Sequence, residues 1–391
     1  MATPNPIIPG AGAERSDALD AVRGVAIGAV VLYHFFSLAP LDFPSWRAGQ
    51  ILATIAGVGR SGVDLFFVLS GFLIGGILLD RRKASNYYGA FYGRRFLRIA
   101  PLYALALAVF WLLYLQMDWH AQHLDPYFRH ATPIWPYLTM TQNIAWVAAG
   151  VGGPAMLGIT WSLAVEEQFY LVLPAMIRWL PDRLVPRVCL MLVVAAPLLR
   201  IALLAAFPHN RLAPYLLLPC RMDALFLGVL AAWMTRQPDV LAQLRAQRRG
   251  LWMAAAGLFL IIALMAVRGV DQFSWTMQAI GYSLYAGAYF FALLLVVSAQ
   301  RALPAWATMA RRPLVWLGLG AYSIYLFHRG IEGVVEGALS GRTTLGMLVS
   351  MALSAAFAVA AWVSVERPLM AYARRRFRYN QSGMEAAEVP A

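Results

Sequence analysis

Cysteine is nearly absent from this sequence, which contains only Cys189 and Cys220 among its 391 residues. Both lie inside apolar stretches, so the sequence offers neither a disulfide framework nor a cysteine-ligated metal site. Three histidines, His120, His123 and His130, lie in one polar segment, but no carboxylate-rich helix accompanies them. We therefore expect no metal centre and interpret this segment as a solvated loop.

The sequence also lacks the polar character of a soluble domain. Hydrophobic residues make up 61% of the chain and its mean hydropathy is +0.62, whereas soluble domains are roughly 45–50% apolar. The first long apolar segment has no small-residue cleavage signal and continues into an aromatic run, so we expect it to be retained. The sequence predicts an all-α, polytopic membrane protein.

Several segments reach the length of about 20 apolar residues that a transmembrane helix needs. In the second of them, Gly71 and Gly75 lie one helical turn apart, a spacing that lets another helix approach closely. Residues 134–150 are apolar but short and interrupted by polar residues, so we expect a re-entrant or interfacial segment there. About ten crossings are predicted, over residues 19–38, 55–79, 99–116, 159–180, 188–207, 214–234, 251–267, 275–297, 314–335 and 345–372.

Positive charge is in excess, with a net charge of +13, yet no nucleic-acid partner follows, because the arginines lie mainly in loops between apolar segments. If the N-terminus is cytoplasmic, the arginine clusters all fall in loops on that side, as the positive-inside rule requires. A full crossing by residues 134–150 would reverse this bias. We therefore expect cytoplasmic termini, with a flexible tail over residues 1–15, a transmembrane domain over 16–372 and a basic, then flexible, tail over 373–391.

Two polar side chains interrupt the first predicted span. Arg23 and His34 lie in a stretch of spanning length, where a charge near the middle costs at least a few kcal/mol. They are eleven positions apart, so they project from nearly the same helical face, roughly 16 Å from each other. Either they carry a function, or Arg23 extends to the lipid headgroups while a neighbouring helix satisfies His34.

The predicted topology places Glu166 at about the depth of His34, on a helix that runs in the opposite direction. Glu166 and Tyr170 are four residues apart and share one face of that helix. A carboxylate beside an imidazole suits general-base catalysis, because it raises the basicity of the ring and fixes its tautomer. The sequence thus predicts a pair of His34 and Glu166, although Glu166 could instead form a structural ion pair with Arg221 or Arg23.

Other polar residues within the predicted spans are candidates for substrate binding. At the predicted inner face, a cluster of three arginines could hold a polyphosphate, because guanidinium groups match phosphate geometry. Positive-inside anchoring explains this cluster equally well. The substrate-binding candidates are Asp64, Ser70, Tyr170, Arg221, Asp223 and His328, and the inner-face arginines are Arg94, Arg95 and Arg98.

Six sequence stretches form an ordered set of motifs along the chain. They are the Arg23 to His34 stretch, GVDLFFVLSGFLI (62–74), FYGRRFLRIAPLY (91–103), TWSLAVEEQFY (160–170), RMDALFLG (221–228) and YSIYLFH (322–328). Together they resemble the acyltransferase-3 family of membrane proteins, over nearly the whole chain. Members of that family transfer acyl groups, usually acetyl from acetyl-CoA, to extracytoplasmic carbohydrates such as lipopolysaccharide O-antigen, peptidoglycan or secreted oligosaccharides.

The resemblance implies that His34 is the catalytic imidazole, Arg23 its paired motif residue and Glu166 its acidic partner. It also implies a bacterial cytoplasmic membrane, with the inner-face arginines on the side of the acetyl-CoA that donates the acyl group. The sequence ends soon after the last span, without the extracytoplasmic hydrolase-like domain of larger members. Delivery to the acceptor could therefore depend on a separate extracytoplasmic partner.

We expect the phosphates of the coenzyme to bind near the inner-face arginines and its pantetheine arm to rise toward His34, past Arg23. His34, oriented by Glu166, would then deprotonate a sugar hydroxyl that attacks the thioester, although a covalent acyl-histidine route also fits. One rival is a transporter of a solute or lipid-linked sugar, with Arg23, Asp64 and Glu166 as binding charges, but no internal repeat is evident. Another is a non-catalytic membrane partner of a soluble enzyme.

Overall fold

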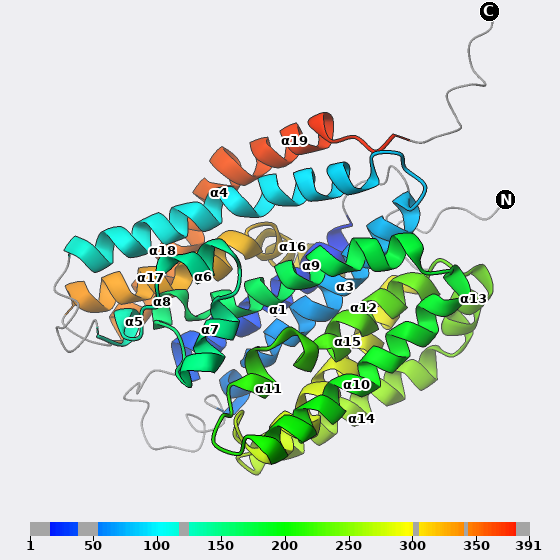
Figure 1. Cartoon of the computed structure of the whole chain (residues 1–391), viewed down its shortest axis with the longest axis horizontal. Coiled ribbons are helices and arrows are strands. Elements are labelled where there is room, and N and C mark those ends of the chain that lie inside the picture. The colour runs from blue at the N-terminus through cyan, green and yellow to red at the C-terminus, as the bar shows by residue number, and fades with distance from the viewer. Residues whose placement is uncertain (1–15, 38–53, 117–124, 300–304, 340–342, 381–391) are drawn as a thin grey trace, which may run out of the picture.

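Helices form the regular structure of all the described parts of the chain. The computed structural model describes residues 16–37, 54–116, 125–299, 305–339 and 343–380, and no strand occurs among them. The helices are drawn and labelled in Figure 1. Their bounds are α1 (Asp17–Leu32), η1 (Tyr33–Ser37), η2 (Gly59–Ser61), α3 (Gly62–Arg81), α4 (Tyr87–Gln116), α5 (Asp125–Phe128), α6 (Ile134–Leu138), α7 (Gln142–Ala149), α8 (Ala155–Gly158), α9 (Thr160–Trp179), η3 (Asp182–Leu184), α10 (Val185–Ala206), α11 (Ala213–Leu216), η4 (Leu218–Cys220), α12 (Met222–Met234), α13 (Pro238–Ala246), α14 (Arg248–Val267), η5 (Met277–Gly281), α15 (Tyr282–Val297), α16 (Ala305–Leu319), α17 (Ala321–Ala338), α18 (Thr344–Ala361), η6 (Trp362–Glu366) and α19 (Arg367–Arg376).

Seven helical segments of the described chain are long and apolar enough to cross a membrane, which confirms a polytopic all-α membrane protein. They are Asp17–Phe36, Thr54–Arg81, Tyr87–Gln116, Asp182–Ala206, Arg248–Val267, Met277–Val297 and Thr344–Arg376. The three other predicted spans are also helical, in α9, α12 and α17. None of these three helices is among the seven. Helix α12 is apolar but has only 13 residues, and α9 and α17 each carry two acidic residues, which lower their hydropathy.

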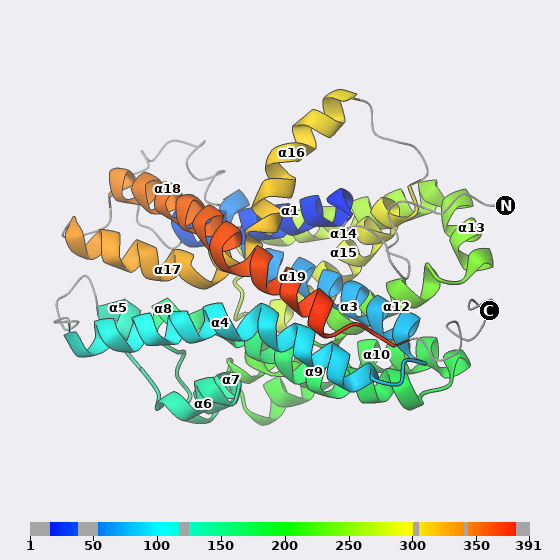
Figure 2. The ribbon, with the colours of Figure 1, turned by 90° about the horizontal axis from the view of Figure 1, so that it is seen from above.

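Two of the predicted spans are broken where continuous helices were expected. The span over residues 214–234 is interrupted between α11 and α12, where Leu217 is extended and Pro219 lacks the N–H that a helix needs. The span over residues 314–335 is divided between α16 and α17 at Gly320, since glycine is a poor helix former. The N-terminal part of α16 points away from the other helices (Figure 2), whereas Leu314 and Gly318 near its C-terminal end lie against α1.

The segment over residues 134–150 forms two short helices, α6 and α7, of 5 and 8 residues. Even the longer one rises only about 12 Å, so neither can cross the roughly 30 Å hydrocarbon core. The segment packs against long helices instead: Tyr103 of α4 donates a hydrogen bond to the Tyr137 carbonyl, and Gln168 of α9 donates one to the Met140 carbonyl. This agrees with the expectation that the segment does not cross.

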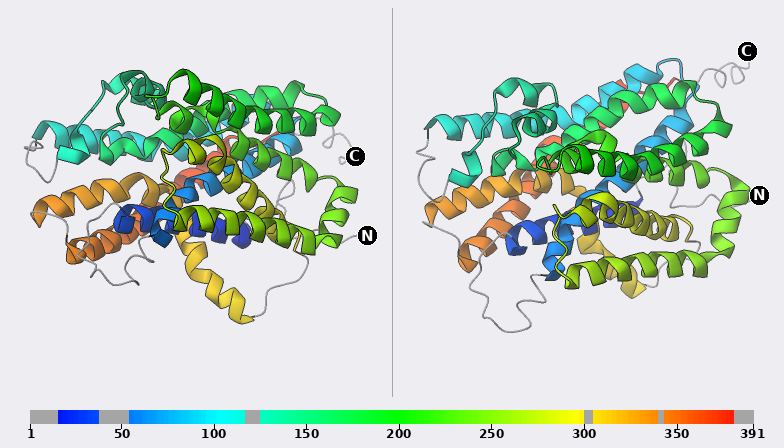
Figure 3. Two further views of the ribbon diagram at one scale, coloured as in Figure 1. Left: turned by 90° about the horizontal axis from the view of Figure 1, so that it is seen from below. Right: turned by 60° about the horizontal axis from the view of Figure 1, so that its bottom comes forward.

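Helices α3 and α12 approach each other closely through glycine. An added side chain at Gly71 would overlap the Leu225 carbonyl, and one at Gly228 would overlap the Val68 carbonyl. Gly75 lies against Val229 one turn away. The predicted helix contact at Gly71 and Gly75 is therefore confirmed, with α12 as the partner. Helices α14 and α15 pack side by side next to this pair (Figure 3).

The C-terminal helix α19 packs along α4 (Figures 1 and 2). Asn86, just before α4, donates a hydrogen bond to the Arg378 carbonyl and accepts one from the Asn380 N–H. Part of the predicted tail is thus helical or held against α4. The predicted flexible tails at residues 1–15 and 381–391 and the loop histidines His120 and His123 lie outside the described residues, and the side of the membrane on which the termini lie stays a prediction.

Candidate active site

His34 and His328 lie side by side, although their sequence positions are far apart. Nδ1 of His34 lies 3.2 Å from Nε2 of His328, and the ring centroids are 4.9 Å apart. His34 belongs to η1, a π-helical turn that extends α1, and such turns are frequent at functional sites. His328 is fully buried on α17. The structure therefore joins the predicted catalytic imidazole to a residue predicted to bind substrate.

Each imidazole is also tied to its own helix. Nδ1 of His34 lies 2.9 Å from the Val30 carbonyl oxygen, and Nδ1 of His328 lies 2.9 Å from the carbonyl oxygens of both Ile324 and Tyr325. A carbonyl oxygen can only accept a hydrogen bond, so Nδ1 is the protonated nitrogen of each neutral ring. This leaves Nε2 of His34 with a free lone pair.

Glu166 lies in a second polar cluster, with Ser70, Tyr170 and Arg95. The Tyr170 hydroxyl donates to the Glu166 carboxylate, at 3.0 Å, and also hydrogen bonds Ser70 on α3. The guanidinium carbon of Arg95 lies 3.9 Å from the centroid of the Tyr170 ring, close enough for a cation–π contact. Residues predicted separately as catalytic, substrate-binding and coenzyme-binding thus meet at one place between α3, α4 and α9.

The predicted pairing of Glu166 with His34 is wrong. Gly62, at the start of α3, lies against Ala26 and Val30 of α1, and Val30 is one turn before His34. Ser70 is eight residues farther along α3, which is about 12 Å toward the N-terminal end of α1. Because the Tyr170 hydrogen bonds hold Glu166 near Ser70, its carboxylate lies too far along the bundle to contact the imidazole.

Arg221 and Asp64 form a buried ion pair between η4–α12 and α3. The guanidinium carbon of Arg221 lies 4.1 Å from the centroid of the Tyr282 ring, and the rings of Trp161 and Tyr215 lie within 6 Å of it. Arg221 does not pair with Glu166, which was the alternative role considered for that acid. Side chains that neutralise each other in this way commonly serve structure.

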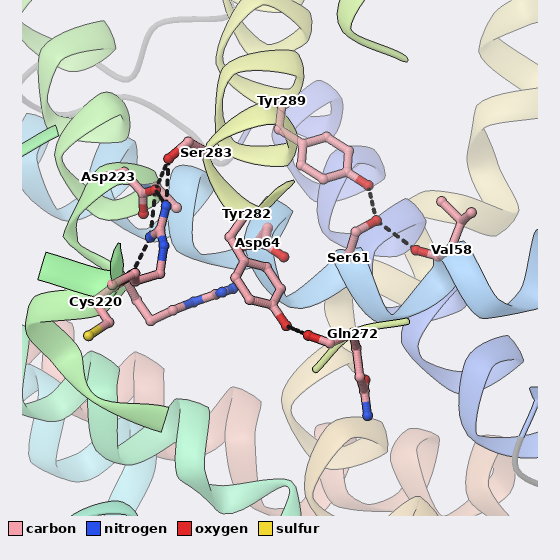
Figure 4. A network of polar contacts seen from close by, with 12 residues as sticks. Val58, Ser61, Asp64, Cys220, Asp223, Gln272, Tyr282, Ser283 and Tyr289 are labelled. Atoms are coloured by element: carbon pink, nitrogen blue, oxygen red, sulfur yellow. Dashed lines mark hydrogen bonds and ion pairs between the residues drawn. The ribbon is translucent and has the colours of Figure 1, made fainter. Parts of the chain in front are cut away.

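Asp223 forms a neighbouring ion pair with Arg200 of α10, at 3.0 Å. Ser283 of α15 donates to the same carboxylate, at 2.7 Å, and the group joins three helices (Figure 4). The sequence reasoning missed Arg200, although an arginine inside an apolar span is a signal for a buried partner. Asp64, Arg221 and Asp223, predicted to bind substrate, thus lie in adjoining ion pairs.

The three inner-face arginines do not form a single cluster. Arg94 donates from Nε to the Phe377 carbonyl, at 2.7 Å, and its guanidinium carbon lies 4.8 Å from the centroid of the Tyr379 ring. Arg95 instead faces the cluster around Tyr170, and Arg98 is close enough to Glu166 to interact with it electrostatically. The helical offset between adjacent residues explains why Arg94 and Arg95 face different neighbours.

A pocket opens between α4 and α19, next to Arg94. It is lined by Tyr92, Phe96 and Leu97 of α4 and by Tyr372 and Arg376 of α19, with Gly93 and Phe377. Aromatic side chains and the guanidinium group of Arg376, whose carbon lies 5.6 Å from the centroid of the Phe377 ring, suit a flat ring joined to phosphate. No sequence pattern predicted this pocket, because its two walls are far apart in the chain.

Arg23 of α1 forms an ion pair with the buried Asp20, one turn earlier. It therefore lies within α1's own polar face rather than beside His34. Arg329 and Glu332, which follow His328 on α17, form another buried pair that the sequence reasoning did not single out. Their signal was available, since both charges lie inside a predicted span. Among the residues that the structure describes, no group of three or more His, Cys, Asp or Glu side chains could hold a metal ion.

Comparisons with known proteins agree on one family. A model of the acyltransferase domain matches residues 16–364. The chain is 32% identical to the peptidoglycan O-acetyltransferase OatA of Listeria monocytogenes over 192 residues, which is 46% of this chain and 27% of that protein. It is 26% identical to the O-acetyltransferase OatA of Staphylococcus aureus over 330 residues, which is 79% of this chain and 49% of that protein.

A third relative is the putative peptidoglycan O-acetyltransferase YrhL of Bacillus subtilis, 26% identical over 332 residues, covering 79% of this chain and 47% of that protein. The chain thus spans less than half the length of each of these relatives. No solved structure matches it.

Proposed function

The chain belongs to the acyltransferase-3 family, and from this premise we propose that it is an O-acyltransferase of a bacterial membrane. It moves an acetyl or other short acyl group from acyl-CoA on the cytoplasmic side to a hydroxyl of an extracytoplasmic carbohydrate. Two of the relatives are named for peptidoglycan, which supports a cell-wall glycan as the acceptor. The proposal is supported by seven described segments that are long and apolar enough to cross a membrane.

The observation that carries this proposal is the imidazole of His34 at the end of a spanning helix. Its Nδ1–H faces the Val30 carbonyl, at 2.9 Å, so Nε2 is left to accept a proton. The ring is only partly buried, whereas His328 behind it is sealed from solvent. A hydroxyl that arrives from the exposed side would meet a base already in the tautomer that it needs.

The proposed reaction is direct transfer. Nε2 of His34 takes the proton of the acceptor hydroxyl as its oxygen bonds to the thioester carbonyl carbon. The carbon–sulfur bond then breaks, and the departing thiolate takes the proton back from Nε2. The imidazole ends the cycle unchanged. An acyl-histidine intermediate would use the same nitrogen as the nucleophile, and a trapped acyl-enzyme would distinguish the two routes.

The cluster of Ser70, Tyr170, Glu166 and Arg95 is proposed to line the path of the pantetheine arm. That arm contains two amides, which cost free energy in an apolar interior unless they find hydrogen-bond partners. The cluster supplies hydrogen-bond donors and acceptors in the part of the bundle between α4 and His34. The pocket beside Arg94, with Arg376, is proposed to take the nucleotide end of the coenzyme.

The test is acyl transfer by the purified protein in lipid nanodiscs, with radiolabelled acetyl-CoA and cell-wall glycan fragments. The wild-type protein should acetylate the glycan, and His34→Ala should lower the rate by two or more orders of magnitude, which is the range of general-base catalysis. Retained turnover in His34→Ala would overturn the assigned role of His34. Uptake of a solute into vesicles without acetyl-CoA would instead support a transporter.

A further inference from the structure

The two hydrogen-bonded imidazoles carry an inference about His328. We infer that His328 is a positioning residue, which holds His34 in the tautomer and orientation that present Nε2 to the acceptor hydroxyl. The inference deepens the proposed function and rests on it. It assigns to a neutral histidine the task that a carboxylate performs in other base-catalysed sites.

The protonation of His328 follows from what surrounds it. Its Nδ1 faces the carbonyl oxygens of Ile324 and Tyr325, at 2.9 Å each, so Nδ1 carries the proton. Its Nε2 faces Nδ1 of His34, at 3.2 Å, and that nitrogen already has a proton directed at the Val30 carbonyl. Two N–H groups cannot point at each other, so Nε2 of His328 is the acceptor of the bond.

The Nδ1–H of His34 is therefore shared between the Val30 carbonyl oxygen and Nε2 of His328. Either acceptor fixes the tautomer, but only His328 also fixes the angle of the ring, because it lies on a different helix. His328 is itself immobilised, since its side chain is completely buried on α17 and bonded to that helix. The direction of Nε2 in His34 is thus set from α17.

The arrangement also suits the charged form of His34. When Nε2 takes the acceptor's proton, both bonds from Nδ1–H become charge-assisted and strengthen. A carboxylate in the place of His328 would do the same, but it would put a permanent charge into an apolar interior. A neutral imidazole avoids that cost, and the hydrogen bond that it accepts from His34 still strengthens when His34 takes up the proton.

The experiment compares His328→Phe and His328→Gln in the nanodisc assay. Phenylalanine keeps a buried ring and removes the acceptor, so kcat should fall roughly 10- to 100-fold, the loss expected for a charge-assisted hydrogen bond, with little change in the KM for acetyl-CoA. Glutamine presents an amide oxygen near the position of Nε2 and should recover kcat to within a few-fold of the wild type. An unchanged kcat in His328→Phe would overturn the inference.

Two controls separate positioning from a loss of structure. Tyr322→Phe removes a hydrogen bond from the same helix, to the Ile99 carbonyl at 2.8 Å, without touching His34 or His328, and should leave kcat within about two-fold. In a His34→Ala background, His328→Phe should cause no further loss of the residual rate, because a residue that acts through His34 has nothing left to position. A further loss of tenfold or more would overturn the inference.

A readout without turnover keeps this inference apart from the proposed function. Nitrogen NMR of histidine-labelled protein in lipid, assigned by difference from His34→Ala, should show Nδ1 of His34 protonated and Nε2 unprotonated. His328→Phe should broaden or shift the Nδ1 signal. If His34→Ala abolishes transfer while His328→Phe leaves both the spectrum and kcat unchanged, the inference about His328 is wrong and the proposed function stands. If His34→Ala retains transfer, the assigned role of His34 fails, whatever the spectrum shows.

Discussion

The guanidinium group of Arg95 lies over the ring of Tyr170, 3.9 Å from its centroid, and so ties α4 to α9. Through the Tyr170 hydroxyl the same contact reaches Glu166 and Ser70. An arginine of the predicted inner face thereby joins a polar cluster inside the bundle. The proposed path of the pantetheine arm passes this contact.

Tyr170→Phe should raise the KM for acetyl-CoA by about tenfold, because the ring under Arg95 remains while the hydroxyl shared by Glu166 and Ser70 is lost. The free energy of unfolding should also fall by about 1–3 kcal/mol, as a buried acceptor loses its partner. Steady-state kinetics and chemical unfolding in nanodiscs measure both.

The matched control for this change is Tyr103→Phe. It removes another buried tyrosine hydrogen bond, to the Tyr137 carbonyl at 3.0 Å, so stability should fall while the KM stays unchanged. An equal rise in KM in both variants would mean that general loosening, and not the cluster, controls coenzyme binding.

The buried pair of Asp64 and Arg221 should be structural. Asp64→Ala should lower the free energy of unfolding by about 3–5 kcal/mol, because it leaves an uncompensated buried cation. The double variant Asp64→Leu with Arg221→Met removes both charges and should recover most of that loss. Recovered stability together with lost acyl transfer would show that the pair binds substrate after all.

Gly71→Ala should be strongly destabilising, since a methyl group there would overlap the Leu225 carbonyl of α12 and force the two helices apart. We expect a loss of about 3 kcal/mol, the upper end of the range for overpacked cores. Gly257→Ala on α14 is the control, because nothing lies within 4 Å of an added methyl group. It should be neutral or stabilise by up to about 1 kcal/mol, and thermal unfolding in detergent measures both.

Arg376→Gln tests the proposed coenzyme pocket. Because this residue contributes a positive charge to the lining of the pocket, the change should raise the KM for acetyl-CoA several-fold and leave kcat unchanged. The KM of the wild type should rise with salt, and that of the variant should rise less steeply. A KM that is the same in the variant and the wild type at low salt would place the phosphates elsewhere.

The helices of this protein were predictable from sequence, because length and hydropathy alone determine whether a segment can span a membrane. Their interruptions were harder to foresee. Pro219 and Gly320 each break an apolar run that was long enough to count as one span, and neither residue excludes a continuous helix by itself. The contact at Gly71 was predictable in kind, whereas its partner α12 was not.

The site was predictable by residue but not by pairing. Depth was inferred from where each span begins, and an error of one or two turns in that origin moves a side chain by about 5–10 Å. The contact of Gly62 with Ala26 sets the true offset between α1 and α3. With this offset, Ser70 and Glu166 lie nearer the N-terminal end of α1 than His34 does. The neighbour of the His34 ring is therefore His328. Which helices pack against each other depends on tertiary contacts, and these could not be predicted from a single sequence.

The pairing of two uncharged rings at the end of α1 bears on how the protein responds to its surroundings. The electrical potential across a bilayer acts mainly on charged groups, at about 2.3 kcal/mol per elementary charge per 100 mV. The neutral rings of His34 and His328 carry no net charge on which the potential could act. The base should therefore keep its geometry in energised and de-energised cells alike.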